Sequence, residues 1–561
     1  MKKTAVSFAL GMVLFSCLLG SQGPERGGPA LTPSERMDKL FDFWNRLDQP
    51  GFAVAVVQDG RVVYQNVFGL ACQEHAVAIT PNSLFNAANL AQVFVGQAVA
   101  LLERQGKLSL DDDVRKHLPE VPDFGIPLKI RHLVFQTSGL RDWWPVLQLA
   151  GRDREEVTIA SVLKLVQAQK KPIYAPGERV QYSNTNYDLL AEVVKRAGGR
   201  PFSEWAWENV FKPLKMTRTL FRDNYRQVLD DQAFSYVFTR QEYLRGIDNL
   251  YLAGSHSLFA SVADLAKWLL ALQAGREEDR EIFAKMFAGG TLDGGRPALM
   301  GYGTRIGLQN GRRVVSQSGR WAGSEAVLNY FPDQKFGFVV LANWDYTTVE
   351  EFVLGIINIY LPPHAPAKKA QAPPAAPAKK AVKTSPEKLD RYAGNYRLGP
   401  GQVISLSRAG SDLVLSVPGQ KFVLTAVSET QFELEVAGAT IVFQPDREGK
   451  VGQFLWKQGG SEVVAPRIVL VKPTAEELKE YAGGYANDEL NLKLAFEVKG
   501  GVLVFEAPGQ GEVRLAPDEK DRFLSIWRAM PALVFQRDAQ GRVVGFIADS
   551  DPIKDLVFKK I

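Results

Sequence analysis

The sequence has few cysteines and no excess of charge of one sign. Only two of its 561 residues are cysteines, which excludes a disulfide-stabilised scaffold. The 67 lysines and arginines nearly balance the 62 aspartates and glutamates, so the formal charge is only +5. Residues 1–22 contain two lysines, and residues 361–384 contain five. These seven positive charges exceed the total of +5, so the rest of the chain has a formal charge of −2. Near-neutral domains offer no basic face, so no nucleic-acid partner is expected.

The composition also lacks a bias toward glycine, proline or polar low-complexity sequence. Hydrophobic residues make up 46% of the chain and charged residues 23%. These values exclude a disordered, collagen-like or many-spanning membrane protein. The length corresponds to several ordinary globular domains.

A short apolar run from Thr4 to about Gly20 follows two lysines at the N-terminus. Its length and position predict a secretory signal over residues 1–22 rather than a membrane span. The stretch ending in Cys17 resembles a bacterial lipobox, so ordinary cleavage and lipidation of Cys17 both stay open. Either route predicts an extracytoplasmic protein, in the periplasm, on the outer membrane as a lipoprotein, or secreted. Lipidation would also provide a membrane anchor. By either route Cys17 is removed or modified, which leaves Cys72 as the only ordinary thiol, and Cys72 is expected to be a buried small hydrophobe.

Residues 35–360 have the pattern of one mixed α and β domain. Asp59-Gly60 joins a first pair of strand-like runs, and Pro332-Asp333 joins a last pair. Amphipathic helical patterns lie between them. The first and last strands are therefore predicted to share one sheet, with the helices inserted between them in the sequence.

Residues 362–384 form a predicted Pro/Ala/Lys linker, and an internal repeat follows it. The linker contains Ala-Pro-Ala-Lys-Lys-Ala twice. Beyond it, the segment Leu389–Tyr396 returns as Leu478–Tyr485. This repeat predicts two small all-β modules, at residues 385–471 and 474–561. In each module an Asp-x-x-Gly sequence is interpreted as a turn rather than a ligand site.

The order of short motifs in the first domain is specific. The motifs are Gly51–Gly60, Thr80–Phe85, Gly106–Asp112, Ile130–Leu140, Pro176-Gly177, Tyr182–Asn184 and Asp264–Trp268. From about residue 38 to 358 they resemble the penicillin-recognising serine hydrolases: class C β-lactamases, D-Ala-D-Ala carboxypeptidases and related esterases. The resemblance implies an α/β (α+β) fold, in which an antiparallel sheet is covered by helices. It also implies an active site between the sheet and a mostly helical subdomain.

That family's chemistry, as the resemblance implies it, needs three elements and no cofactor. A serine that opens a helix is activated by a lysine three residues later. A Tyr-x-Asn loop helps to relay the proton, and a strand with Lys or His before x-Gly completes the electrostatic wall. Acyl transfer then passes through a covalent acyl-enzyme.

The residues at the reacting positions differ from that pattern. Asn89 stands at the position of the serine, and Gln92 at that of the lysine. Tyr182 and Asn184 are kept, but the third element begins with Gln317. A carboxamide is neither a nucleophile nor a base near neutral pH. Loss of the nucleophile alone costs about 10⁶ in kcat in a well-studied serine protease, so efficient acyl-enzyme chemistry is not expected.

Other residues offer weak replacements. Ser161 and Ser385 each begin a Ser-x-x-Lys sequence, and both are interpreted as chance matches. Tyr182 lacks a lysine that would lower its pKa. Four histidines lie outside the third element, and no spacing suggests a metal site; they are His75, His117, His132 and His256.

Three hypotheses remain open. The favoured one is a secreted pseudoenzyme that binds a neutral peptide, glycan or ester-like ligand of the cell envelope without cleaving it. The second is a working hydrolase with altered catalytic residues or a displaced nucleophile. The third makes the β modules an interaction arm, with the first domain as scaffold. The predicted ligand-binding residues, some of which should converge within one ligand's width, are Asn89, Gln92, Tyr182, Asn184, Gln317, Ser318, Gly319 and Arg320, and Arg320 is a candidate contact for a carboxylate.

Overall fold

The computed structural model describes residues 31–239, 241–275, 277–345, 349–361, 384–399, 402–417, 420–458, 461–549 and 553–561. The predicted export signal, Cys17 and nearly all of the predicted linker lie outside the described residues. Among the described residues, no helix combines the length and hydrophobicity needed to cross a membrane. Cys72 is buried, as expected.

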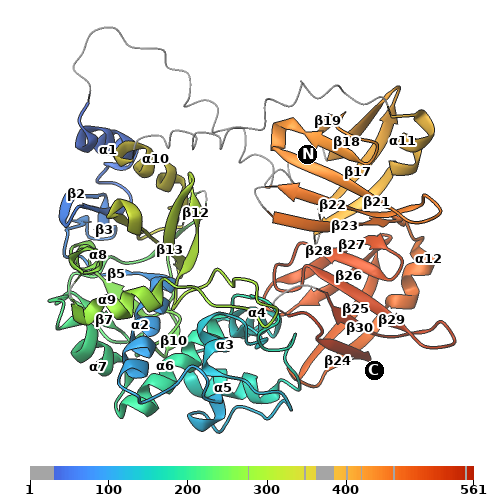
Figure 1. Cartoon of the computed structure of the whole chain (residues 1–561). Helices are drawn as coiled ribbons and strands as arrows, with labels where there is room; N and C mark the ends of the chain where they lie inside the picture. Colours follow the sequence, from blue (N-terminus) through green and yellow to red (C-terminus); the bar gives the residue numbers. More distant parts are fainter. Residues whose placement is uncertain are drawn as a thin grey trace.

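A six-stranded antiparallel sheet forms the centre of the N-terminal domain (Figure 1). In sheet order its strands are β12 (Arg305–Gln309), β13 (Arg312–Trp321), β14 (Ser324–Phe331), β15 (Phe336–Ala342), β1 (Phe52–Gln58) and β2 (Arg61–Phe68). Strand β1 pairs with β15, so that Phe52 lies opposite Ala342. The first and last strands thus share one sheet, as their patterns predict.

Helices cover both faces of this sheet, because alternate residues of β1 enter two different apolar clusters. On one face, Val54 packs in a cluster with α1 (Pro33–Phe41) and α10 (Glu350–Tyr360). On the other face, Ala55 packs in a larger cluster with α2 (Ala91–Arg104), α8 (Val262–Ala274) and α9 (Glu277–Met286). Strands β14 and β15 are buried along their whole length, as expected for strands covered on both sides. The predicted α/β (α+β) fold class is therefore confirmed.

A mostly helical subdomain lies beside the sheet and packs on α2. Its main helices are α3 (Ile130–Val134), α4 (Trp143–Leu149), α5 (Ile159–Ala168), α6 (Asn184–Gly198) and α7 (Phe202–Ala206). Short strands complete this region: β3 (Leu70–Cys72), β4 (Val77–Ala78), β5 (Phe85–Asn86), β6 (Val157–Thr158), β7 (Thr219–Phe221), β8 (Tyr236–Phe238), β9 (Tyr243–Arg245), β10 (Leu250–Tyr251) and β11 (Leu258–Ala260). Side chains at the N-terminal ends of α2 and α6 meet near β13, as the next subsection describes.

Two closed eight-stranded barrels follow, which confirms the two predicted all-β modules. The first follows α11 (Pro386–Tyr392) and contains β16 (Gly394–Gly399), β17 (Gln402–Ala409), β18 (Asp412–Val417), β19 (Gln420–Ala426), β20 (Gln431–Leu434), β21 (Ala439–Pro445), β22 (Val451–Gln458) and β23 (Ser461–Ile468). The second follows α12 (Ala475–Leu478) and contains β24 (Gly483–Asn487), β25 (Leu492–Lys499), β26 (Val502–Ala507), β27 (Gly511–Glu519), β28 (Arg522–Ser525), β29 (Ala532–Arg537), β30 (Val543–Ala548) and β31 (Val557–Lys560). Aromatic side chains fill both interiors.

The repeated sequence has a structural explanation in each barrel. The Tyr396 hydroxyl donates to the backbone oxygen of Tyr392 at 2.9 Å, and the Tyr485 hydroxyl donates to that of Tyr481 at 2.8 Å. Tyr392 ends α11, and Tyr481 ends the 3₁₀ helix η9 (Lys479–Tyr481) that follows α12, so each bond satisfies a carbonyl at the end of the helical segment before its barrel. The repeated tyrosine pair therefore fixes each helix to the first strand of its barrel.

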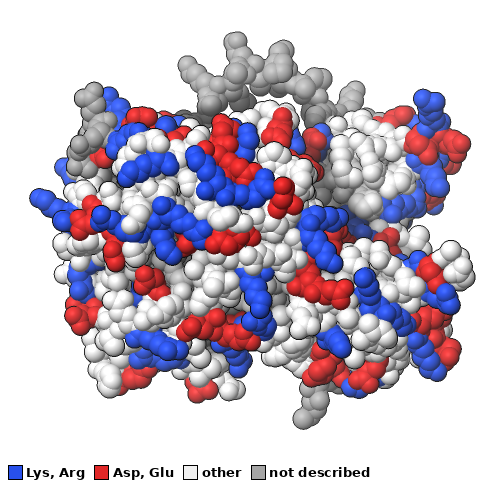
Figure 2. All heavy atoms as spheres, turned by 90° about the horizontal axis from the view of Figure 1, so that it is seen from below, with Lys and Arg blue, Asp and Glu red and all other residues white. Residues whose placement is uncertain are grey.

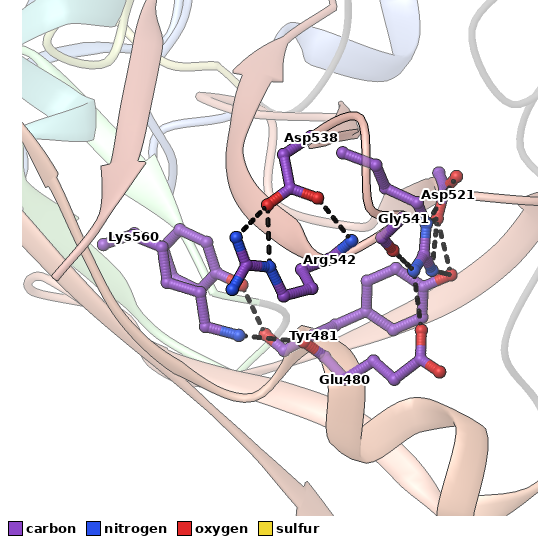
Figure 3. Close-up of polar contacts among 9 residues, drawn as sticks. Glu480, Tyr481, Asp521, Asp538, Gly541, Arg542 and Lys560 are labelled. Atoms are coloured by element: carbon purple, nitrogen blue, oxygen red, sulfur yellow. Dashed lines mark hydrogen bonds and ion pairs between the residues drawn. The ribbon is translucent and has the colours of Figure 1, made fainter.

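The Asp-x-x-Gly sequences form turns, as predicted. The Asp538 carboxylate accepts backbone N–H groups of Gln540 and Arg542 at 3.0 and 2.9 Å, and it also pairs with the Arg542 guanidinium (Figure 3). Asp446 accepts equivalent backbone N–H groups in the first barrel. Both carboxylates thus serve their own turns.

The second barrel packs against α4 of the N-terminal domain (Figure 1). Val146 and Leu149, on one side of α4, belong to the same apolar cluster as the barrel interior. Beside them, Arg141 lies 3.6 Å from the Glu489 carboxylate and donates to the Lys554 carbonyl at 3.3 Å. The other side of α4 contributes to a cluster of the N-terminal domain. Helix α4 therefore lies between the second barrel and the rest of the N-terminal domain.

Acidic and basic side chains are interspersed on the molecular surface. Figure 2 shows both signs side by side over the face that it presents, with no extended field of one sign there. This distribution agrees with the near-neutral charge of the folded parts of the sequence.

Candidate functional site

Four structural elements bring the predicted site residues together. Asn89 lies in the 3₁₀ turn η4 (Ala88–Leu90) and Gln92 in the first turn of α2. Tyr182 lies just before α6 and Asn184 is the first residue of that helix. Gln317 lies on β13, which faces η4. The structure thus places all five side chains in one region between the sheet and the helical subdomain.

The backbone at the start of this region is strained. Ala88 has a φ of 45°, in the left-handed region that L residues other than asparagine and aspartate seldom adopt. The Asn86 side chain accepts the Ala88 N–H at 3.0 Å and supports this conformation. Such strain is concentrated at functional sites and requires support from the surrounding structure. The turn therefore presents residue 89 at a fixed position before α2.

Four side chains form a chain of hydrogen bonds that runs in one direction. The Gln317 amide donates to Gln92 Oε1 at 3.4 Å and to the Gly303 carbonyl at 2.9 Å. The Gln92 amide donates to the Tyr182 hydroxyl at 2.6 Å. That hydroxyl donates to Asn184 Oδ1 at 3.0 Å. Gln92 and Gln317 are fully or almost fully buried, so these amides are bonded within the protein.

The chain ends on Asp142, which the sequence interpretation missed. Asn184 Nδ2 lies 3.3 and 3.0 Å from the two Asp142 carboxylate oxygens. The same carboxylate caps α4 by accepting the Trp144 N–H at 3.0 Å. Complete burial raises the pKa of Asp142 to about 6. Asp142 thus connects the candidate site to the helix against which the second barrel packs.

Asn89 contacts a second residue that the sequence interpretation missed, His256. Asn89 Nδ2 lies 3.0 Å from Asn184 Oδ1, 3.3 Å from the Ser255 carbonyl oxygen and 3.1 Å from His256 Nε2. His256 Nδ1 lies 2.9 Å from Ser255 Oγ. Burial lowers the pKa of His256 to about 3, so the imidazole is neutral near pH 7. No motif in the sequence connects His256 with Asn89, because they are brought together by the fold.

The residues after Gln317 on β13 have distinct environments. An ideal Cβ at Gly319 would lie 2.4 Å from the backbone nitrogen of Asn89, so only glycine permits this approach of β13 to η4. Ser318 is half-buried. The Arg320 guanidinium forms an ion pair with the buried Glu325 carboxylate on β14. Arg305 on β12 is exposed, and its guanidinium carbon lies 6.0 Å from the centre of the Tyr182 ring, so it is a second cation at the candidate site.

An aromatic cluster lies beside the amide groups. The Trp321 ring packs edge-on against Trp144, with ring centres 4.8 Å apart, and lies 4.7 Å from the His256 ring. Trp143 joins the cluster and donates through Nε1 to Asp188 Oδ2 at 2.6 Å. The candidate site therefore combines bonded amides with aromatic rings.

The remaining candidates have structural contacts. Ser161 completes the capping box of α5, because its hydroxyl accepts the Thr158 N–H at 2.9 Å, and Ser385 caps α11. His132 is buried and accepts the Lys129 N–H through Nδ1 at 3.1 Å. Within the described parts of the chain, no group of His, Cys, Asp and Glu side chains has the arrangement of a metal site.

Comparison with protein-family models and curated proteins identifies relatives over most of the chain. Residues 38–357 match the Beta-lactamase family model, and residues 378–465 match a domain of unknown function, DUF3471. "Penicillin-binding protein 4*" of Bacillus subtilis (strain 168) is 26% identical over 458 residues, which cover 76% of this chain and 97% of that protein. "D-aminopeptidase" of Brucella melitensis biotype 1 is 26% identical over 519 residues, which cover 88% of this chain and 93% of that protein.

A solved structure supports the same fold. The octameric penicillin-binding protein homologue from Pyrococcus abyssi aligns with a TM-score of 0.52 and 19% identity, over 85% of this chain and 98% of that chain. The family model covers more than half of the sequence and includes the sheet, the helical subdomain and the amide groups described above. The chain therefore belongs to the β-lactamase family of serine-hydrolase fold.

Proposed function

We propose that this protein is a β-lactamase-family pseudoenzyme of the cell envelope, which binds a peptide-, glycan- or ester-like ligand without cleaving it. The observation that carries the proposal is the chain of hydrogen bonds from Gln317 through Gln92 and Tyr182 to Asn184. Its carboxamides stand where the family's chemistry, as stated above, needs a base and an electrostatic wall. Asn89 stands at the position of the nucleophile, and its side-chain nitrogen Nδ2 is also bonded within the protein.

The acid–base properties of these groups support the proposal. A carboxamide nitrogen neither attacks an acyl group nor accepts a proton near neutral pH. Burial raises the pKa of the Tyr182 hydroxyl well above its usual range, so this group stays protonated. It donates to Asn184 and accepts from Gln92, so its partners are neutral carboxamides. Deprotonation of Tyr182 as an alternative nucleophile is therefore strongly disfavoured.

The surroundings of the amides support a polar ligand with some apolar surface. Partly exposed Trp144 offers an aromatic face for the C–H groups of a sugar or peptide side chain. Half-buried Ser318 can donate or accept a hydrogen bond, and exposed Arg305 can meet a negative charge. The names of the relatives, a penicillin-binding protein and a D-aminopeptidase, also favour a peptide-like ligand.

A covalent probe tests the proposal. The full-length wild type is incubated with a fluorophosphonate and with a fluorescent penicillin, beside the double variant Asn89→Ser/Gln92→Lys. We expect labelling of the double variant only, at the introduced serine, because the substitutions restore a nucleophile and a base on one helix face. The variant Ser161→Asn/Lys164→Gln, which removes the Ser-x-x-Lys sequence of α5, is the control and should behave as the wild type. Stoichiometric labelling of one wild-type side chain would overturn the proposal in favour of an active hydrolase.

Binding is tested separately by cosedimentation with insoluble peptidoglycan. We expect the wild type to sediment and an Asn89→Ala/Arg305→Ala variant to sediment less. Equal sedimentation of both proteins, or of neither, contradicts the assignment of this region as a site for an envelope peptide or glycan.

The predicted location forms part of the proposal. Export through residues 1–22 would bring the chain to the envelope, either with a cleaved signal or with a lipid on Cys17. Metabolic labelling with a palmitate analogue distinguishes the two routes. Incorporation that is lost in Cys17→Ser supports the lipoprotein, and an unlabelled, processed protein supports ordinary cleavage.

A further inference from the structure

The environment of Asn89 fixes which end of its carboxamide points into the protein. Asn184 Nδ2 must face the two acceptor oxygens of Asp142, so Asn184 Oδ1 faces Asn89. The backbone oxygen of Ser255 is a second acceptor on the same side, 3.3 Å from Asn89 Nδ2. Rotation of the Asn89 amide by 180° would place its oxygen against both acceptors. The nitrogen of Asn89 is therefore the inward atom.

This orientation determines the tautomer of His256. A carboxamide nitrogen cannot accept a hydrogen bond, so His256 Nε2, 3.1 Å from Asn89 Nδ2, carries no proton and faces the NH2 group with its lone pair. A neutral imidazole then has its proton on Nδ1, which donates to Ser255 Oγ at 2.9 Å. The Ser255 hydroxyl in turn donates to Asp188 Oδ2 at 3.1 Å. Asp188 also accepts the Ser255 N–H at 2.7 Å and is held by the Trp143 indole.

The outward atom of the same carboxamide is an acceptor. Within the described residues, no donor reaches Asn89 Oδ1. This oxygen is also not fully buried, because it is absent from the set of buried polar atoms without a partner. It lies against Gly319, whose ideal Cβ would be 2.6 Å away, on the side of β13 that faces η4. A ligand group at this place meets an oxygen lone pair, where an unpaired ligand carbonyl or carboxylate would be repelled.

We propose that His256 is a positioning residue that holds the Asn89 oxygen toward the site, and that the site thereby selects a ligand group that donates a hydrogen bond. The selected group is an amide N–H or a hydroxyl rather than a carbonyl or a carboxylate. This inference rests on the proposed function, because it specifies the ligand of that same site. It concerns residues outside the family's three catalytic elements, since Ser255, His256 and Asp188 belong to none of them.

The tautomer can be measured without a ligand. In the full-length protein with ¹⁵N-labelled histidine, long-range ¹H–¹⁵N spectra report which ring nitrogen carries the proton. His132 is the internal control, because its Nδ1 accepts the Lys129 N–H and its proton must be on Nε2. The pKa values of the two rings are lowered by burial, to about 4 for His132 and about 3 for His256, so both rings should be neutral at pH 7.

Among the five histidines, we expect the rings of His132 and His256 to be neutral with opposite tautomers. An Nε2–H signal that is lost in His132→Gln and an Nδ1–H signal that is lost in His256→Gln assign the two rings and support the inference. A neutral His256 with its proton on Nε2, or a charged His256, overturns it, because either would turn the Asn89 oxygen inward.

Ligand selection is tested with a matched pair of probes, N-acetylalanine methylamide and its N,N-dimethylamide, which lacks the terminal N–H donor. Saturation-transfer NMR should show that the wild type binds the first at least ~10-fold more tightly, since one hydrogen bond to a site atom is lost. The Asn89→Ala variant should lose most of this preference. Equal binding of the two probes by the wild type overturns the inference but leaves the proposed function intact. Absence of binding by either probe counts against the proposed function, and the tautomer measurement still decides the role of His256.

Discussion

The site residues sit in a densely packed region, where a single added methyl group has measurable consequences. Gly319→Ala should lower the free energy of unfolding by about 1–3 kcal/mol, because its Cβ would overlap the Asn89 backbone. Gly307→Ala, on neighbouring β12, is the matched control, since its Cβ would meet no atom within 4 Å. Urea denaturation of both variants checks the prediction. A similar change in both would show that β13 and η4 are not in tight contact.

Buried His256 predicts a specific dependence of stability on pH. Its ordinary pKa of 6.5 falls to about 3 in the folded protein, so below pH 6.5 the unfolded chain binds a proton that the folded protein does not. The wild type should therefore lose about 2 kcal/mol relative to His256→Gln between pH 6.5 and pH 5. The raised pKa values of Asp142 and Asp188 act in the opposite direction, but these residues are present in both proteins. Parallel stability curves for the two proteins would contradict the prediction.

The sequence predicts the residues of the site that belong to motifs, and it misses those that do not. Asn89, Gln92, Tyr182 and Gln317 could be found because each stands in a segment with a fixed place in the family's order. Asp142 and His256 follow no such spacing. Their proximity to Asn184 and Asn89 depends on how α4, α6 and the loop before β11 pack, which no local pattern encodes.

At the scale of single elements, α4 depends on both of its neighbours. Arg141, next to its N-cap, is buried with Glu489 of the second barrel, and burial raises the pKa of Glu489 and lowers that of Arg141. Glu489→Gln should leave a buried guanidinium without its ion-pair partner and cost about 3 kcal/mol. It should also increase hydrogen–deuterium exchange in residues 141–150. Glu497→Gln, which breaks an exposed pair with Lys499, should change neither quantity noticeably.

The two barrels offer a second test at this scale, because the same hydrogen bond occurs in each. Tyr396→Phe and Tyr485→Phe each remove one hydroxyl and leave the ring, so each should cost about 1 kcal/mol. Thermal unfolding of the two variants checks this expectation. A large effect in one barrel and none in the other would show that the repeated tyrosine has different roles.

Element type was predictable wherever alternation or a turn sequence was strong. The hairpin at Asp59-Gly60 follows from such a pattern, and so does the prediction that the first and last strands share one sheet. Local alternation does not show which strands close each β module into a barrel, where β16 pairs with β23 and β24 pairs with β31.

For the molecule as a whole, the second barrel joins the two halves of the chain. The first barrel is linked to the second by Arg397, which lies 3.4 Å from the buried Asp518 carboxylate. The second barrel in turn holds α4 through Val146, Leu149 and Arg141. Proteolytic cleavage within residues 362–383 should therefore leave two fragments that elute together in size-exclusion chromatography. Separate elution at micromolar concentration would contradict this interface.

This arrangement could not be predicted from the sequence. The repeat and the linker composition indicate separate modules, and nothing in either pattern shows that α4 would share an apolar cluster with the second barrel. Contacts between units depend on the fit of whole surfaces rather than on local periodicity.

The chain of hydrogen bonds from Gln317 to Asp142 also has a consequence for the movement of protons. A proton conductor needs links that can each release one proton and take up another, and that can then reverse their direction. Carboxamides do not titrate near neutral pH, and reversal here would turn the Gln317 nitrogen away from the Gly303 carbonyl and aim the Asn184 oxygen at the Asp142 carboxylate. Between Gln317 and the buried Asp142 carboxylate, these side chains therefore keep one direction of hydrogen bonding and do not conduct protons.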